Sequence, residues 1–176
     1  MARRAERTMT DLVPLAGRFW RMLGVRWQRR PFDSGAHLTG GRWNPPGMAA
    51  LYLSADHATA IAEMHQDLVR PGTLVAFDIR ADAIADLRGG DPAVLGCAWR
   101  RLFQLDHCVP PTWTLAETLR DAGADGALVP SVQQAGGSNL VLWRWHDART
   151  AGPGAALTLL DPEAVLTDDA SDAAKS

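Results

Sequence analysis

The chain has very little lysine, tyrosine or cysteine. Lys175 is its only lysine, Tyr52 is its only tyrosine, and its two cysteines are Cys97 and Cys108. Two cysteines at this separation exclude a disulfide framework and a zinc site of paired thiolates, and they suit small apolar residues in a reducing compartment. Arginine in place of lysine indicates a GC-rich coding bias. No apolar run approaches the roughly 20 residues that a membrane-spanning helix needs.

Charge and length indicate one globular domain. The net charge of −2 gives no general attraction to nucleic acid or to an anionic membrane, and the apolar share of 47% is ordinary for a protein with a core. We expect a flexible segment over 1–10, a single domain over 11–165 and an acidic, disordered tail over 166–176. The arginine-rich start lacks an apolar h-region, so we expect a cytoplasmic protein that binds neither nucleic acid nor membrane directly.

Several familiar site motifs are missing. The sequence contains no G-x-G-x-x-G after a strand, no G-x-x-x-x-G-K-[ST], no H-E-x-x-H and no G-x-S-x-G, so it predicts no Rossmann fold, P-loop, zinc protease or serine hydrolase. The five histidines lack ligand-like spacing, and no metal site is expected. The seven tryptophans are scattered, which favours core and interface positions over a base-stacking surface.

Strand-like and helix-like segments interleave irregularly along the chain. Strands are predicted at 18–23, 49–53, 73–79, 126–129, 139–145 and 157–160, and helices at 55–69, 91–103 and 112–123. The strand at 139–145 fits a half-buried antiparallel position, and 28–48 fits a long ordered loop. Ser54 is expected to cap the first helix. The apolar stripe of that helix is predicted to be Ala58, Ile61, Ala62, Met64, His65 and Leu68. The class is α+β, with small mixed or antiparallel sheets and flanking helices.

The segment Gly40–Gly47 is the first candidate for binding chemistry. Gly40 and Gly41 allow positive φ and a close approach of the backbone to a ligand. Arg42 follows them and could present its planar donors to a pyrophosphate. The alternative is a solvated or structural arginine in a turn, and the sequence leaves both open.

Three further positions are candidates on chemical grounds. Tyr52 could stack on a ligand ring or be a core tyrosine with a satisfied hydroxyl. Glu63 interrupts a run of small apolar residues, and it is either a functional carboxylate or a solvated flank position. Ser138 and Asn139 follow Gly136 and Gly137 at the start of a strand, where they either contact a ligand or form a plain turn.

Taken together, these segments resemble the RES-domain family. The resemblance rests on Gly-Gly-Arg42-Trp43-Asn44, on Tyr52 and Glu63, and on the segment Gly137–Leu142. The arginine, glutamate and serine for which the family is named match Arg42, Glu63 and Ser138. The resemblance covers roughly residues 17–145, and its serine match is looser than the others because it depends on a turn and strand context.

The resemblance implies a function. RES proteins are toxins of bacterial type II toxin–antitoxin pairs, and their partners are Xre-type antitoxins with a helix-turn-helix domain. Their fold is similar to that of diphtheria-toxin-like ADP-ribosyltransferases. They consume NAD as a substrate, so no permanently bound cofactor is expected. The implied activity is ADP-ribosyltransferase, NAD glycohydrolase or NAD phosphorylase, with water, phosphate or a protein side chain as the acceptor.

The resemblance also implies residue roles. Glu63 would stabilise the positive charge that develops on the ribose when the nicotinamide bond breaks. Arg42 would anchor the pyrophosphate, Tyr52 would stack against nicotinamide, and Ser138 would supply a polar contact. Arg42 and Tyr52 join Glu63 in the expected catalytic set. The expected NAD-binding set is Arg21, as a second phosphate contact, with Arg42, Trp43, Tyr52, Ser138 and Asn139.

Two other classes of function stay open at this level. In the first, the chain is a non-catalytic protein-interaction module whose partner surface is formed by 28–48 and the tryptophans. In the second, the arginine-rich first quarter binds nucleic acid. The second is disfavoured by the negative net charge.

Overall fold

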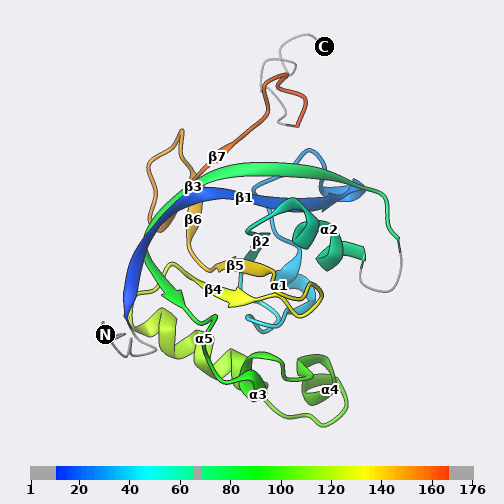
Figure 1. Ribbon diagram of the computed structural model, residues 1–176, viewed down its shortest axis with the longest axis vertical. Helices are drawn as coiled ribbons and strands as arrows, with labels where there is room; N and C mark the ends of the chain where they lie inside the picture. The colour runs from blue at the N-terminus through cyan, green and yellow to red at the C-terminus, as the bar shows by residue number, and fades with distance from the viewer. Residues whose placement is uncertain (1–10, 66–68, 167–176) are drawn as a thin grey trace, which may run out of the picture.

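Two long strands dominate the architecture. A computed structural model describes residues 11–65 and 69–166, so the expected flexible segment and all but the first residue of the expected acidic tail lie outside the described residues. β1 (Leu12–Gly24) and β3 (Gly72–Asp86) pair antiparallel, with Leu12 opposite Ala85 at one end and Gly24 opposite Gly72 at the other. Figure 1 shows them as two long curved ribbons lying side by side. Both are longer than the strands predicted from the sequence.

Five shorter strands complete one mixed sheet. They are β2 (Leu51–Ser54), β4 (Gly126–Pro130), β5 (Ser138–Leu142), β6 (Trp145–Asp147) and β7 (Ala155–Leu159). The strand order is β1-β2-β5-β4-β3-β7-β6, and the additional β1–β3 pairing closes β1, β2, β5, β4 and β3 into a ring. Only the β3–β4 and β6–β7 pairs of the described residues are parallel. The predicted α+β class is confirmed, although the strands join one sheet instead of several small ones.

β5 differs from the prediction in its length and its burial. The predicted strand 139–145 is divided into β5 and β6, because Trp143 and Arg144 both donate their backbone N–H to the carbonyl of Asp125. β5 lies between β2 and β4. Leu140 and Leu142 belong to one core cluster and Val141 to another, so both faces of the strand are covered. The prediction of an antiparallel strand is confirmed, and the prediction of half-burial is wrong.

The helices are short, and three of them gather on one side of the sheet (Figure 1). They are η1 (Val25–Trp27), α1 (Ala36–Thr39), α2 (His57–His65), α3 (Pro92–Leu95), α4 (Trp99–Gln104) and α5 (Pro111–Asp121). In Figure 1, α3, α4 and α5 lie together below β4 and β5. α5 agrees with the predicted helix at 112–123. No helix within the described ranges is long and apolar enough to cross a membrane.

The predicted helix at 91–103 is two helices with a break between them. Asp91 caps the first one by accepting a hydrogen bond from the backbone N–H of Ala93, and Gly96 closes it with bonds to the carbonyls of Pro92 and Val94. The chain then leaves helical geometry and restarts at Trp99. The break places the backbone carbonyls of Leu95 and Cys97 where the side chain of Arg42 donates to them.

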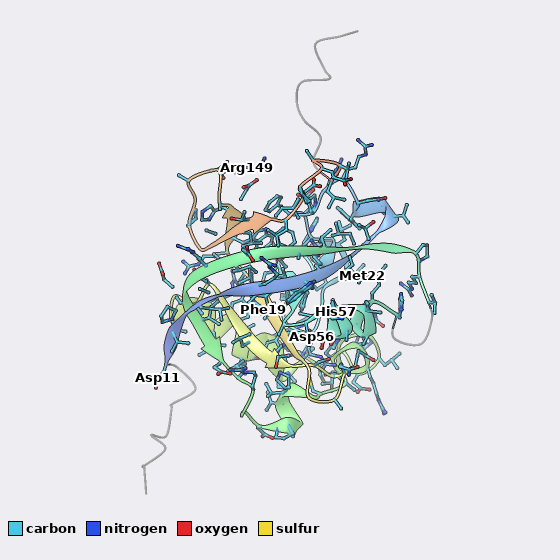
Figure 2. All side chains as sticks on the ribbon, turned by 45° about the horizontal axis from the view of Figure 1, so that its top comes forward. Asp11, Phe19, Met22, Asp56, His57 and Arg149 are labelled. Atoms are coloured by element: carbon cyan, nitrogen blue, oxygen red, sulfur yellow. The ribbon has the colours of Figure 1, made fainter. Side chains whose placement is uncertain are left out.

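α2 begins later than predicted and has a different cap. Asp56 accepts a hydrogen bond from the backbone N–H of Thr59 at 2.8 Å, whereas the predicted cap, Ser54, donates to Asn139 instead. The predicted apolar stripe is wrong at Ala58 and Ile61, which are exposed, because the buried positions of α2 are Thr59 and Ala60. Leu68 of that stripe lies outside the described residues. α2 packs against β1, and Figure 2 labels Asp56 and His57 where the helix starts.

The core is divided between the two faces of the sheet. One cluster centres on Phe77 and Leu53, and the other joins the sheet to Ala116 and Leu119 of α5. Four of the seven tryptophans are buried: Trp43, Trp99, Trp113 and Trp143. The predicted core use of tryptophan is confirmed for these four. Trp43 and Trp99 line the site pocket, and Trp113 packs against Trp99.

Candidate active site

One pocket gathers almost all of the predicted site residues. It has a volume of about 380 Å³ and is formed by β1, β2, α2, the start of α4 and the loop that precedes β2. This volume suits a small-molecule ligand. The predicted residues that line it are Arg21, Arg42, Trp43, Tyr52, Glu63 and Asn139. Ser138 is the one member of the predicted set that is not among its lining residues.

Glu63 is held in place by two hydrogen-bond donors. The side-chain amide of Asn139 and the hydroxyl of Ser131 both donate to its Oε1 atom, each at 2.6 Å. Asn139 is oriented in turn, because its Oδ1 atom accepts the hydroxyl of Ser54 at 2.8 Å. Hydrogen bonds to a carboxylate are stronger than neutral ones. This chain from β2 through β5 to α2 therefore fixes the carboxylate at the pocket wall.

Sequence reasoning missed Ser131. Its hydroxyl also accepts the backbone N–H groups of Gln133 and Gln134, at 3.2 Å and 2.9 Å, so it shapes the turn after β4. Ser138 lies opposite Pro130 in the β4–β5 pair, and its carbonyl accepts the N–H of Ala55. The signal that could have found Ser131 is its place directly after a buried strand, at the head of a polar turn.

Arg42 is tethered to the break between α3 and α4. Its Nη1 atom donates to the carbonyls of Cys97 at 2.6 Å and Leu95 at 3.2 Å. Its own carbonyl accepts the hydroxyl of Thr112 at 2.6 Å. The backbone and guanidinium are thus both fixed, and the side chain reaches the pocket in a set direction. The break between α3 and α4 therefore supplies the two carbonyls that hold the side chain of Arg42.

The two glycines before Arg42 serve different purposes. Gly40 has φ +77°, in the region that other residues rarely adopt. At Gly41, a Cβ atom would lie 2.6 Å from the Tyr52 hydroxyl and 2.7 Å from Asn44 Oδ1. The expectation of positive φ is therefore met at Gly40. The close approach at Gly41 is to the protein's own side chains.

Arg21 is a partly buried cation on β1. Its Nη1 atom donates to the carbonyls of Asp33 at 2.7 Å and Pro31 at 2.8 Å. Burial lowers the pKa of Arg21 to about 10, and the nearby Asp33 carboxylate opposes that shift. The guanidinium still carries its charge at neutral pH. It therefore adds a second fixed positive charge to the pocket.

Tyr52 combines a pocket-lining side chain with a structural hydroxyl. The hydroxyl donates to Asn44 Oδ1 at 2.7 Å and accepts the backbone N–H of Trp43 at 2.9 Å. Burial raises the pKa of Tyr52, so it stays protonated. Asn44 has no exposed surface and also donates to the carbonyls of Ala36 and Met48. The tyrosine thus holds the Arg42 loop while its side chain lines the pocket.

A second, larger pocket is lined by none of the residues predicted to bind NAD. Its volume is about 820 Å³, and it lies between the segment 27–38 and β6. One of its carboxylates, Asp147, is already paired with Arg149 at 2.7 Å. In the described part of the chain, no group of three or more His, Cys, Asp and Glu residues could hold a metal ion. We therefore assign the chemistry to the smaller pocket.

Comparison with known proteins identifies the family. The RES domain matches residues 18–161, a range that contains every residue lining the smaller pocket. The chain belongs to the RES-domain family. The structure of this RES-domain chain is similar to that of a chain in the crystal structure of the M. tuberculosis MbcT–MbcA toxin–antitoxin complex. The TM-score is 0.58 at 19% identity, over 85% of this chain and 84% of that one, and this likeness shows a shared fold. No curated protein matches the sequence.

Proposed function

We propose that this RES-domain protein is the toxin of a bacterial toxin–antitoxin pair and that it cleaves the nicotinamide–ribose bond of NAD. Membership of the RES family and the fold shared with a chain of a toxin–antitoxin complex support the first part. The pocket supports the second, because it places a carboxylate and two guanidinium groups around a space of ligand size. The shared fold also supports a protein antitoxin as its partner, and from the family resemblance we propose that this antitoxin is of the Xre type.

The fixed carboxylate of Glu63 is the observation that carries the proposal. When the bond from ribose C1 to the nicotinamide nitrogen breaks, nicotinamide leaves with the electron pair and positive charge develops on the ribose. A carboxylate already held by Ser131 and Asn139 needs no reorganisation to face that charge. Its negative charge stabilises the transition state more than the ground state, which is the condition for catalysis.

Arg42 and Arg21 would bind the pyrophosphate of NAD. Arg42 and Arg21 both line the pocket, and each is anchored through carbonyl groups. A pyrophosphate carries negative charge at neutral pH, and guanidinium groups bind phosphate oxygens with good geometry. The side chain of Tyr52 offers an apolar surface for the nicotinamide ring. These residues would hold NAD so that the reacting ribose lies at Glu63.

The acceptor completes the reaction. An oxygen of water, of phosphate or of a protein side chain bonds to ribose C1 and loses its proton, which gives ADP-ribose, its phosphorylated form or a modified protein. Incubation with adenine-labelled NAD and a cell lysate separates these outcomes. Label on a discrete protein band indicates transfer, and labelled small molecules indicate degradation.

The decisive test is Glu63→Gln, which keeps the shape of the side chain and removes its charge. We expect nicotinamide release to fall by at least about a hundredfold, the scale of one preorganised electrostatic contact. Glu117→Gln is the matched control, because Glu117 is exposed on α5 and is not among the pocket residues. Circular dichroism checks that each variant is folded. Undiminished release by Glu63→Gln would refute the catalytic role.

Thermal shift with NAD separates catalysis from a pure interaction module. A ligand that binds the folded state alone raises its melting temperature. We expect such a shift for the wild-type protein. An absence of both shift and turnover would favour the interaction module instead.

A further inference from the structure

The beginning of α4 carries two pocket residues to which the proposed reaction assigns no role. Trp99 and Arg100 both line the pocket. Trp99 is only 8% exposed and packs against Trp113, with ring centroids 6.3 Å apart. The ring centroids of Trp113 and Phe103 are 4.8 Å apart, and Trp113 donates its ring N–H to the carbonyl of Gly41. Trp99 is therefore a rigid part of the wall.

Arg100 lies against this tryptophan. Its guanidinium carbon is 4.8 Å from the centre of the Trp99 ring, while the residue as a whole is exposed. No carboxylate in the described part of the chain forms an ion pair with Arg100. Its neighbour Arg101 instead lies 3.6 Å from Asp106. Arg100 thus presents a planar cation to the pocket, supported from behind by an indole ring.

The position of Trp99 and Arg100 along the pocket indicates which part of NAD they would contact. The donors to Glu63 come from the β4–β5 connection, whereas Arg42 bonds to the carbonyls of Leu95 and Cys97, immediately before α4. Arg42 therefore lies in the pocket beside the segment that leads into α4. In NAD, the pyrophosphate stands between the reacting ribose and the adenosine. With the ribose at Glu63 and the pyrophosphate at Arg42, the adenosine extends toward α4.

We propose that Arg100, supported by Trp99, is the platform on which the adenine ring of the dinucleotide stacks. This inference rests on the proposed function for the orientation of the substrate. Guanidinium planes and aromatic rings both stack on the faces of bases, and the indole ring of Trp99 holds the guanidinium in place. The platform selects substrates that carry a base at this end. It reads the face of the ring and not its hydrogen-bonding edge.

Binding of substrate fragments tests the platform without depending on turnover. ADP-ribose contains the adenosine, whereas nicotinamide mononucleotide lacks it. By isothermal titration calorimetry we expect Arg100→Ala to raise the Kd for ADP-ribose about tenfold, the scale of one lost base stack. The same variant should bind nicotinamide mononucleotide as the wild type does. Arg101→Ala, one residue further along α4, should change neither Kd.

A second substitution separates stacking from charge. Arg100→Lys keeps the positive charge and removes the plane, so it should also weaken binding of ADP-ribose. Any one of four results would overturn the platform. These are full binding of ADP-ribose by Arg100→Lys, unchanged binding by Arg100→Ala, equal weakening of both fragments by Arg100→Ala, and no binding of ADP-ribose by the wild type. Failure of the wild type to release nicotinamide would instead count against the proposed reaction, and the comparison of Kd values would still be readable.

Discussion

Replacing Tyr52 by phenylalanine removes one hydroxyl and keeps the aromatic ring beside the pocket. That hydroxyl donates to Asn44 Oδ1 at 2.7 Å and accepts the backbone N–H of Trp43 at 2.9 Å. Both partners belong to the loop that carries Arg42, and the side chain of Asn44 has no exposed surface. The substitution therefore leaves a buried acceptor and a buried donor without their partner.

The magnitude follows from these two groups. Leaving one buried polar group unsatisfied costs about 1–3 kcal/mol. With two such groups, and with Asn44 still held through its amide to Ala36 and Met48, we expect Tyr52→Phe to lower the free energy of unfolding by about 2–4 kcal/mol. Because the ring stays in place for the nicotinamide, binding of nicotinamide mononucleotide well below the melting temperature should change by no more than about twofold.

Urea unfolding followed by circular dichroism measures the loss. Thr118→Val is a suitable control, since it removes an exposed hydroxyl that donates to the carbonyl of Thr114 within α5. Surface changes of this kind usually alter stability by less than about 0.5 kcal/mol. If Tyr52→Phe cost no more than this control, water would be satisfying the two groups and the assigned role of the hydroxyl would be refuted.

Three further substitutions test other contacts. Gly41→Ala would place a methyl group 2.6 Å from the tyrosine hydroxyl and should destabilise the protein by about 1–3 kcal/mol in urea unfolding, whereas Gly89→Ala meets no atom within 4 Å and should be nearly neutral. Ser131→Ala removes a donor to the Glu63 carboxylate and should lower nicotinamide release at least about tenfold; an equal or larger loss in Ser138→Ala would contradict the role given to Ser131. The pKa of Asp56 is lowered because the backbone N–H and the hydroxyl of Thr59 donate to its carboxylate. The cap therefore stabilises α2 fully above about pH 4, and this stabilisation is lost as the pH falls through the folded-state pKa. Asp56→Ala should therefore cost about 1 kcal/mol at pH 7 and less at pH 3, while Asp56→Asn should keep the cap without that dependence on pH.

The sequence identified most of the pocket because its residues lie on elements with local signals. Arg42 follows two glycines, Tyr52 lies in a short apolar strand, and Glu63 interrupts a run of small residues. The structure brings these three to one pocket. Short-range pattern was enough to select them, since each stands out against its own neighbours.

The remaining features depend on pairings between distant segments. Closure of the ring requires β1 to meet β3, and no local pattern specifies that pairing. The hydrogen bond from Ser131 to Glu63 was missed for the same reason. Ser131 and Ser138 stand at opposite ends of the β4–β5 connection, where the N–H of Ser131 bonds to the carbonyl of Gly137. Only the placement of α2 beside this turn decides which hydroxyl meets Glu63.

The burial of Arg21 has an electrostatic cost that an anionic ligand would relieve. Burial lowers its pKa from the usual value of an arginine to about 10. A shift of that size corresponds to about 3 kcal/mol of electrostatic free energy that opposes the charged state in the ligand-free protein. An apolar side chain on β1 would avoid this cost, as replacement of buried charges in other proteins often does. A phosphate beside Arg21 would remove the same penalty on binding, because an opposite charge nearby favours the charged form of the guanidinium. The unfavourable energy of the empty site therefore becomes part of the affinity for a ligand that carries negative charge.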